Sequence, residues 1–181
     1  MFIRVRDLEA EALSFDREFR PGTIDLGAEM RALGPLRVTG RADLIEERTH
    51  GVKETIKDIR VTGHFSGTVQ IQCARCLENM TRDLAAEFDL LYRPLAAVER
   101  DDQLAISEAD TEVGFYKGEG LQLEDVLREQ LLLAVPVKAV CREECRGLCP
   151  QCGQNLNEGK CACGPAPSDP RWNALRELRG K

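Results

Sequence analysis

The clearest regular pattern in the chain is a long alternation of apolar residues with polar or small ones, before its midpoint. The large apolar residues of this run share odd positions: Ile59, Val61, Phe65, Val69 and Ile71. A period of two buries one face of a strand and leaves the other in solvent, as in antiparallel sheets. Gly63 and Gly67 lie inside the run, and they predict bulges or a break into two strands.

Weaker patterns of the same kind predict further strands on both sides of this run. Apolar residues between turn signals indicate strands at residues 2–5, 12–19, 36–44 and 84–92. Residues 46–51 have the polar composition of a hairpin tip. The first half of the chain is therefore expected to be mostly antiparallel sheet.

One helix is expected after the strands, at residues 122–133. Its apolar residues follow the helical spacing i, i+3, i+4 and i+8: Leu123, Val126, Leu127 and Leu131. Pro136 ends this helix, because the residue before a proline is pushed out of the α region.

The predicted fold class is α+β: a mainly antiparallel β-sheet packed with one helix, plus a small C-terminal cysteine-rich zinc module. We expect a β-rich domain at residues 1–136, which contains the CARC motif, an acidic loop at 95–120 and the helix at 122–133. A zinc-binding tail is expected at residues 137–181, with a short helix at 169–178.

The cysteines carry the strongest chemical signal. Six of the eight lie between positions 141 and 163, and the other two form the CARC motif far upstream. In CPQC and CARC, two thiols two residues apart can wrap one tetrahedral zinc ion, with Zn–S distances of about 2.3 Å. Two such knuckles and two looser pairs supply enough ligands for two Zn²⁺ ions: Cys73, Cys76, Cys141, Cys145, Cys149, Cys152, Cys161 and Cys163.

Two other interpretations of the cysteines compete with zinc. A disulfide scaffold is typical of short secreted chains, and no signal peptide is recognisable in this sequence. A redox-active dithiol sits at a strand-to-helix turn in thioredoxin-like enzymes, and neither pair is expected in that context. Zinc bound by reduced thiols in a cytoplasmic protein is therefore favoured. The longest apolar run is too short to cross a membrane.

The cysteines can share two metal ions in two ways. In the preferred grouping, Cys73 and Cys76 join Cys141 and Cys145, and the four later cysteines form the second site. In the rival grouping, the four cysteines from position 141 to 152 share one ion, and the upstream pair is structural or has no partner. The preferred grouping closes the long loop 77–140, which is no objection because loop-closure entropy grows only logarithmically with length.

Charge is unevenly distributed along the chain, whose formal net charge is −6. Residues 137–181 carry 8 basic and 5 acidic side chains, against 17 basic and 26 acidic ones in residues 1–136. Phosphate contacts need basic side chains, so acidity weakens an RNA-binding interpretation for the chain but not for its tail. The candidate phosphate contacts are Arg75, Arg142, Arg146, Lys160, Arg171, Arg176 and Arg179. Solvated surface charge is the alternative for each.

Several motifs together resemble the YceD family of bacterial proteins, which are described as large ribosomal RNA accumulation proteins and have plastid relatives. The motifs are CARCLE, then GLQLEDVLREQLLLAVPV, C-x3-C-x-GLCPQCGQNLN, C-x-C and DPRW-x2-L. The resemblance implies a non-enzymatic factor needed for normal levels of large-subunit rRNA, through processing, stability or early assembly.

Two hypotheses about function follow. The first is a zinc-containing factor that acts on large-subunit rRNA or on the pre-ribosomal particle. The second is a zinc-stabilised interaction module that binds a ribosomal protein. A thiol oxidoreductase is a further alternative, and it requires a cysteine with a lowered pKa and turnover of disulfides. The sequence has no nucleotide-binding loop, no Ser/His/Asp arrangement and no placed pair of carboxylates, so the protein is not expected to be an enzyme.

Overall fold

The computed structural model describes residues 1–48, 55–98 and 113–164, and these form two compact units. The sheet unit comprises the described residues within Met1–Ile71 and Met80–Val137. The cysteine unit comprises Gln72–Asn79 and the described residues from Lys138 onward. The predicted helix at 169–178 lies outside the described residues.

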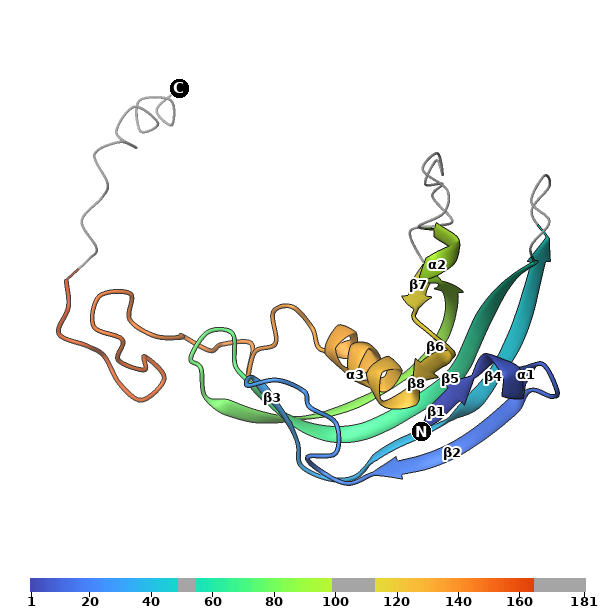
Figure 1. The fold of residues 1–181 in the computed structure, drawn as a ribbon. Coiled ribbons are helices and arrows are strands. Elements are labelled where there is room, and N and C mark those ends of the chain that lie inside the picture. Colours follow the sequence, from blue (N-terminus) through green and yellow to red (C-terminus); the bar gives the residue numbers. More distant parts are fainter. Residues whose placement is uncertain (49–54, 99–112, 165–181) are drawn as a thin grey trace, which may run out of the picture. The chain divides into compact units, whose positions relative to one another are not determined.

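Six strands form the main sheet of the described chain (Figure 1). They are β2 (Leu13–Phe19), β4 (Leu36–Arg48), β5 (Thr55–Gln72), β6 (Asn79–Pro94) and β7 (Val113–Tyr116), in that order, with β3 (Met30–Ala32) paired to β5. The pairings β2–β4, β3–β5 and β4–β5 are antiparallel, whereas β6–β7 is parallel. A separate antiparallel pair joins β1 (Phe2–Arg4) to β8 (Gly120–Gln122).

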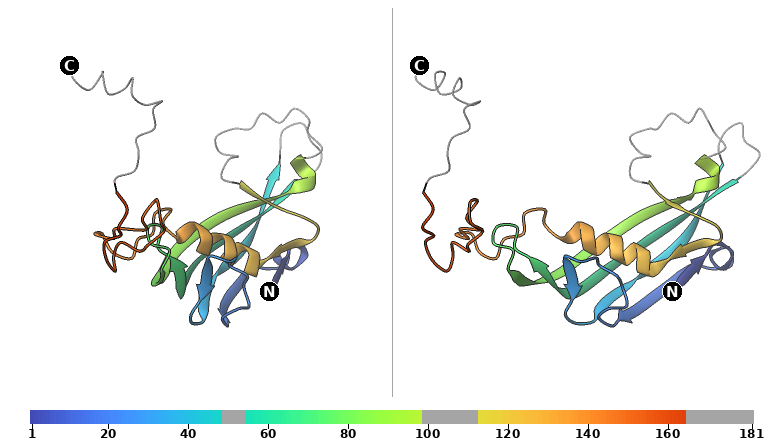
Figure 2. Two further views of the ribbon diagram at one scale, coloured as in Figure 1. Left: turned by 90° about the vertical axis from the view of Figure 1, so that its left-hand side faces the viewer. Right: turned by 60° about the vertical axis from the view of Figure 1, so that its left-hand side comes forward.

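Helix α3 (Leu123–Ala134) lies in the hollow of the curved sheet (Figures 1 and 2). Its predicted apolar stripe is buried, and so are the odd-numbered apolar residues of β5. The stripe consists of Leu123, Val126, Leu127 and Leu131. The apolar face of α3 and the apolar face of β5 are thus both removed from water, and together they form the core of the sheet unit. The sequence pattern therefore identified this core correctly.

Strand β5 runs without a break from Thr55 to Gln72, so the predicted interruption at Gly63 and Gly67 is wrong. The glycines make room for neighbouring side chains instead. A Cβ atom at Gly63 would lie 2.8 Å from the ring of Phe88, and one at Gly67 would lie 2.4 Å from the side chain of Leu36. A periodic pattern cannot distinguish a glycine that breaks a strand from one that admits a neighbouring side chain.

Three further expectations need correction. The described chain contains three helices rather than one, because α1 (Val5–Leu8) and α2 (Leu95–Val98) each form a single turn. The described part of the predicted loop 95–120 contains α2, β7 and the start of β8, elements too short to show a period. Strand β4 extends to Arg48, beyond the predicted start of the hairpin tip at residue 46. No helix in the described part is long and apolar enough to cross a membrane.

Substitution of Gly63 by alanine is expected to destabilise the sheet unit by about 1–3 kcal/mol, since an added methyl group in a filled site forces neighbours to shift. Besides the Phe88 ring, the new Cβ would lie 2.5 Å from the carbonyl oxygen of Thr39, which belongs to the backbone and cannot rotate away. Urea unfolding measures the change. Gly34→Ala is the matched control, because nothing lies within 4 Å of a Cβ there. Equal stability of the two variants would contradict the packing described.

Candidate metal centres

The eight cysteine sulfurs lie in two clusters of four, both within the cysteine unit. The first cluster contains Cys73, Cys76, Cys141 and Cys145, and the second contains Cys149, Cys152, Cys161 and Cys163. Within each cluster all sulfurs lie within 4.8 Å of one another. The sulfurs thus cluster as in the preferred grouping from the sequence, and those of positions 141–152 do not form one cluster. All eight thiols are free.

The two C-x-x-C motifs form knuckles with the same backbone hydrogen bonds. In CARC, the Cys73 N–H donates to the Glu78 carbonyl at 2.9 Å, and the Leu77 N–H donates to the Cys73 carbonyl at 2.9 Å. In CPQC, the Cys149 N–H likewise donates to the Gln154 carbonyl at 2.8 Å, and the Gly153 N–H donates to the Cys149 carbonyl at 2.9 Å. The first knuckle turns the chain between β5 and β6, so it has no strand-to-helix context.

Leu77 occupies in the first knuckle the place that Gly153 occupies in the second. Both have left-handed backbones, with φ of 59° and 74°. This conformation costs a non-glycine residue about 1–2 kcal/mol, so the bonds of the knuckle must hold Leu77 in place. Its side chain is 57% exposed. Superposing CARCLE on CPQCGQ in the sequence would have revealed this equivalence.

The sulfur separations in the first cluster fit a tetrahedral metal site. The Cys73 and Cys145 sulfurs are 3.8 Å apart, as are those of Cys76 and Cys141. A regular tetrahedron with Zn–S bonds of about 2.3 Å has sulfur–sulfur edges of about 3.8 Å, whereas a disulfide needs about 2.05 Å. Four thiols at this spacing are a donor set suited to zinc. The same ligand type makes up the second cluster.

Polar side chains from the CPQC–CAC segment and the CARC knuckle connect the two clusters. The Asn157 amide donates to the Cys145 sulfur at 3.4 Å, while its oxygen accepts from the Arg146 N–H at 2.8 Å. The Asn155 amide donates to Glu78 at 2.6 Å. These asparagines belong to the QNLN stretch between the pairs of the second cluster. Sequence reasoning missed them, because side-chain hydrogen bonds to sulfur leave no spacing signal.

Hydrogen-bond donors favour the thiolate at three sulfurs, one of which is Cys145, whose pKa is lowered by the Asn157 amide and the Gly147 N–H. Burial raises the pKa of the Cys73 thiol, but the N–H groups of Cys76, Arg75 and Cys141 donate to its sulfur and bring the pKa down to about 6. For Cys149, N–H donation from Cys152 and Gln151 lowers the pKa to about 6. Donors aimed at sulfur favour the thiolate, which is the form that binds metal.

Other sulfurs of the clusters resist ionisation. The Glu78 N–H lowers the pKa of Cys76, but desolvation and the neighbouring sulfurs outweigh it and raise that pKa to about 12. Hydrogen bonding with Cys152, followed by burial, raises the pKa of Cys163 to about 12. Anions this close repel one another. A bound dication removes this conflict, so the donor sets fit a metal such as zinc.

The predicted phosphate contacts fall into three groups. Arg142, Arg146 and Lys160 are exposed on the cysteine unit. The Arg75 guanidinium donates to the carbonyls of Glu143 and Cys145, both at 2.9 Å, which ties the CARC knuckle to the segment that carries Cys141 and Cys145. Arg171, Arg176 and Arg179 lie outside the described residues. His64 is exposed on β5, and His50 lies outside the described residues.

The fold and the two clusters define a class of protein: a β-sheet protein that carries a cysteine-rich unit with two sites of metal-binding geometry. The chain belongs to the YceD family, because the family described as "Large ribosomal RNA subunit accumulation protein YceD" matches residues 61–179. This match spans both CARC and the cysteine-rich segment.

Several individual proteins are similar to this chain, and the name of one of them contains that of the family. The chain is 32% identical to an uncharacterized protein of Mycobacterium tuberculosis over 71% of this chain and 59% of the relative. It is 26% identical to the Arabidopsis thaliana protein "Large ribosomal RNA subunit accumulation protein YCED homolog 1, chloroplastic", over 68% of this chain and 45% of the relative. The uncharacterized protein YlbN of Bacillus subtilis is 26% identical to the chain, over 84% of this chain and 79% of the relative. The chain thus spans 59% of the length of this Mycobacterium tuberculosis relative. No solved structure matches it.

Proposed function

We propose that this protein is a non-enzymatic, zinc-containing factor that supports accumulation of large-subunit ribosomal RNA, and that it acts on this RNA or on the assembling particle. The observation that carries the proposal is the pair of four-sulfur clusters in one compact unit. Membership of the YceD family supplies the link to large-subunit RNA. The proposed ligands are all eight cysteines, with one Zn²⁺ ion in each cluster.

The role proposed for zinc is structural. A catalytic zinc ion keeps one coordination position open for water or substrate, whereas four thiolates close the coordination sphere. A structural zinc site contributes about 10–16 kcal/mol in small modules, which matches the entire stability of an ordinary domain, about 5–15 kcal/mol. Few large apolar side chains of the cysteine unit are buried, so metal binding is the main available source of its stability.

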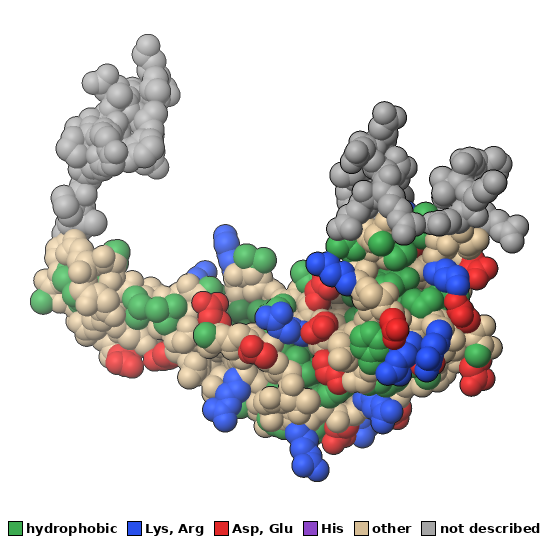
Figure 3. All heavy atoms as spheres, in the orientation of Figure 1, with side chains coloured by type: hydrophobic (Ala, Val, Ile, Leu, Met, Phe, Trp, Pro, Cys, Tyr) green, Lys and Arg blue, Asp and Glu red, His purple; other side chains and the backbone are tan. Residues whose placement is uncertain are grey.

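The proposed RNA-binding surface lies on the cysteine unit. Together, residues 72–79 and 138–181 carry 9 basic and 6 acidic side chains, whereas the rest of the chain carries 16 basic and 25 acidic ones. On the visible face of the sheet unit, basic and acidic side chains are interspersed, so no broad basic surface lies there (Figure 3). Arg142, Arg146 and Lys160 are therefore the first candidates for contacts with phosphate.

Direct RNA binding is tested by titrating the zinc-loaded full chain against large-subunit rRNA fragments at several salt concentrations. Each phosphate contact releases counterions, so affinity should fall steeply as salt rises. Arg142→Gln with Arg146→Gln should weaken binding and flatten the salt dependence. Arg17→Gln with Arg31→Gln, which removes two exposed charges from the sheet unit, should leave both unchanged. A salt-independent affinity would contradict direct binding of RNA.

A further inference from the structure

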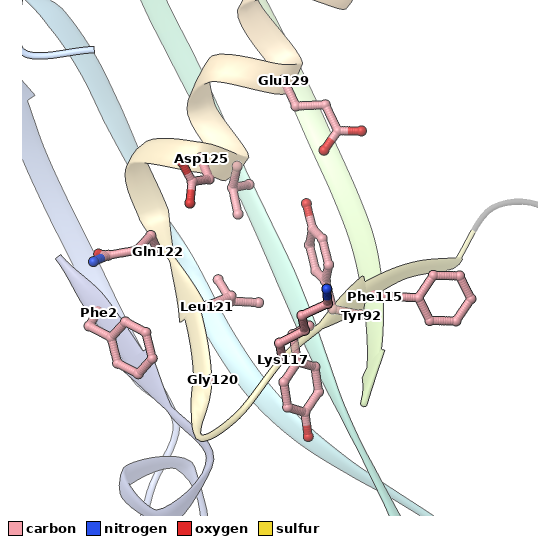
Figure 4. A pocket seen from close by; sticks show the side chains of 11 residues that line it. Phe2, Tyr92, Phe115, Lys117, Gly120, Leu121, Gln122, Asp125 and Glu129 are labelled. Atoms are coloured by element: carbon pink, nitrogen blue, oxygen red, sulfur yellow. The ribbon is translucent and has the colours of Figure 1, made fainter. Parts of the chain in front are cut away.

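The sheet unit contains a cavity of about 350 Å³ that the proposal above does not use (Figure 4). Its walls include the rings of Phe2, Tyr92 and Tyr116 and the carboxylates of Asp125 and Glu129. Its volume is at the small end of the range for ligand pockets, about 300–1,000 Å³. Aromatic rings and carboxylates both attract cations, so a cavity lined by them is suited to bind a positively charged group.

The two carboxylates project from α3 on one face, since residues four apart lie on successive turns of a helix. Both carboxylates line the cavity, and Figure 4 shows Glu129 above the ring of Tyr92 and Asp125 one turn earlier on α3. Both side chains are exposed, and neither forms an ion pair within the part of the chain that the structure describes. Like charges at this spacing repel, so a cation bound between them would relieve that repulsion.

The aromatic walls are fixed in place. Tyr116 is 5% exposed, and its hydroxyl donates to the Lys57 carbonyl at 2.7 Å. Tyr92 is 9% exposed, and burial together with the charges of Glu129 and Asp125 raises its pKa to about 12. Its hydroxyl therefore stays protonated and can donate to a carboxylate. The negative faces of such rings attract cations.

We propose that this cavity binds the guanidinium group of an arginine, presented by a basic segment of a partner protein. A guanidinium is planar, so it stacks on aromatic rings while its N–H groups fork to carboxylates, which a lysine ammonium cannot do. One wall residue already attracts a guanidinium, since Arg4, which does not itself line the cavity, lies 5.5 Å from the centre of the Phe2 ring. Phosphate groups of RNA would be repelled by Asp125 and Glu129.

Charge also favours a basic partner, rather than the neighbouring residues 99–112 of this chain, as the occupant of the cavity. Residues 99–112 carry six acidic side chains and one basic one, so their charge gives them no preference for this cavity. The sheet unit as a whole is acidic. The inference depends on neither zinc nor RNA binding.

The test is a titration of the ¹⁵N-labelled, zinc-loaded full chain with the peptide GGRGRGG, followed by NMR. Matched peptides carry lysine or the uncharged arginine analogue citrulline in place of arginine. We expect the arginine peptide to shift the amide signals of Leu121, Gln122 and Val126. The citrulline peptide should bind about tenfold more weakly or not at all, because hydrogen bonds that involve charged groups are the strong ones.

Variants locate the binding. Asp125→Asn with Glu129→Gln should weaken binding of the arginine peptide about tenfold, whereas Asp16→Asn with Glu29→Gln, an equal charge change at exposed positions, should leave it within twofold. Lys117→Gln should tighten binding, because Lys117 also lines the cavity and repels a cation.

Four results would overturn the proposal. Equal binding of the citrulline peptide would exclude recognition of charge, and equal binding of the lysine peptide would exclude recognition of the guanidinium. If the cavity variant and the control variant lose equal affinity for the arginine peptide, the net charge of the protein alone attracts the peptide. If Arg171→Gln with Arg176→Gln and Arg179→Gln shifts the same amide signals in the absence of peptide, the occupant is the chain's own C-terminal segment and not a partner.

Discussion

Removal of zinc by a strong chelator is expected to unfold the cysteine unit and to leave the sheet unit folded. In the proposed function each cluster of the cysteine unit binds one Zn²⁺ ion, and a structural zinc site contributes about 10–16 kcal/mol in small modules. The sheet unit has its own apolar core, which includes Phe65, Leu127 and Leu131. Loss of metal therefore removes the main source of stability from one unit only.

Amide hydrogen exchange measures this effect residue by residue. Without zinc, the knuckle amides of Cys73, Leu77, Cys149 and Gly153, which are hydrogen-bonded in the folded unit, should exchange at the rate of an unfolded chain. The amides of the β4–β5 ladder, such as that of Val61, should stay protected. Protection that persists at the knuckle amides after complete removal of metal would show that zinc does not hold this unit together.

The variant Asp58→Ala is expected to destabilise the sheet unit by about 3–5 kcal/mol, the usual cost of removing one partner of a buried ion pair. Asp58 is 1% exposed on β5, and Arg93 of β6 donates to its carboxylate at 2.9 Å. The substitution leaves the Arg93 cation, whose side chain is only 15% exposed, without this carboxylate. A loss of this size is a large part of the roughly 5–15 kcal/mol that stabilises a typical domain.

A second ion pair between the same two strands provides the control. Arg60 of β5 donates to Asp89 of β6 at 2.8 Å, but both side chains are about half exposed. Water and salt screen exposed pairs, so Asp89→Ala should change stability far less than Asp58→Ala. Urea unfolding of both variants, in the presence of zinc, compares them directly. If the two variants lose equal stability, the Asp58–Arg93 pair is not buried as described.

Sequence patterns predicted those features of the fold that periodicity carries. The alternation in β5 and the stripe at Leu123, Val126, Leu127 and Leu131 identified the core. Short elements escaped prediction: β7 has four residues and α2 has four, too few to establish a period. The buried pair of Asp58 and Arg93 also escaped, because nothing local marks a charge whose partner lies on another strand.

The candidate metal site was predictable for a different reason. Thiol spacing in CARC and CPQC is a local constraint, since both sulfurs must reach one ion, so it appears directly in the sequence. The hydrogen bonds that support the clusters were not predictable, because Arg75 reaches the Cys145 carbonyl across 70 residues and the bond from Asn157 to the Cys145 sulfur leaves no spacing signal. The left-handed Leu77 was missed for another reason: leucine by itself gives no hint of this conformation, and only the alignment of CARCLE with CPQCGQ places it at the position of Gly153.

The central claim is that eight sulfurs hold two zinc ions, and native mass spectrometry of freshly purified, reduced full chain tests it most directly. Two zinc ions per chain are predicted, with one remaining after Cys76→Ser, which removes a ligand of the first cluster, and one remaining after Cys163→Ser, which removes a ligand of the second. A chain that carries no zinc, or one that keeps both ions in either variant, would contradict the account.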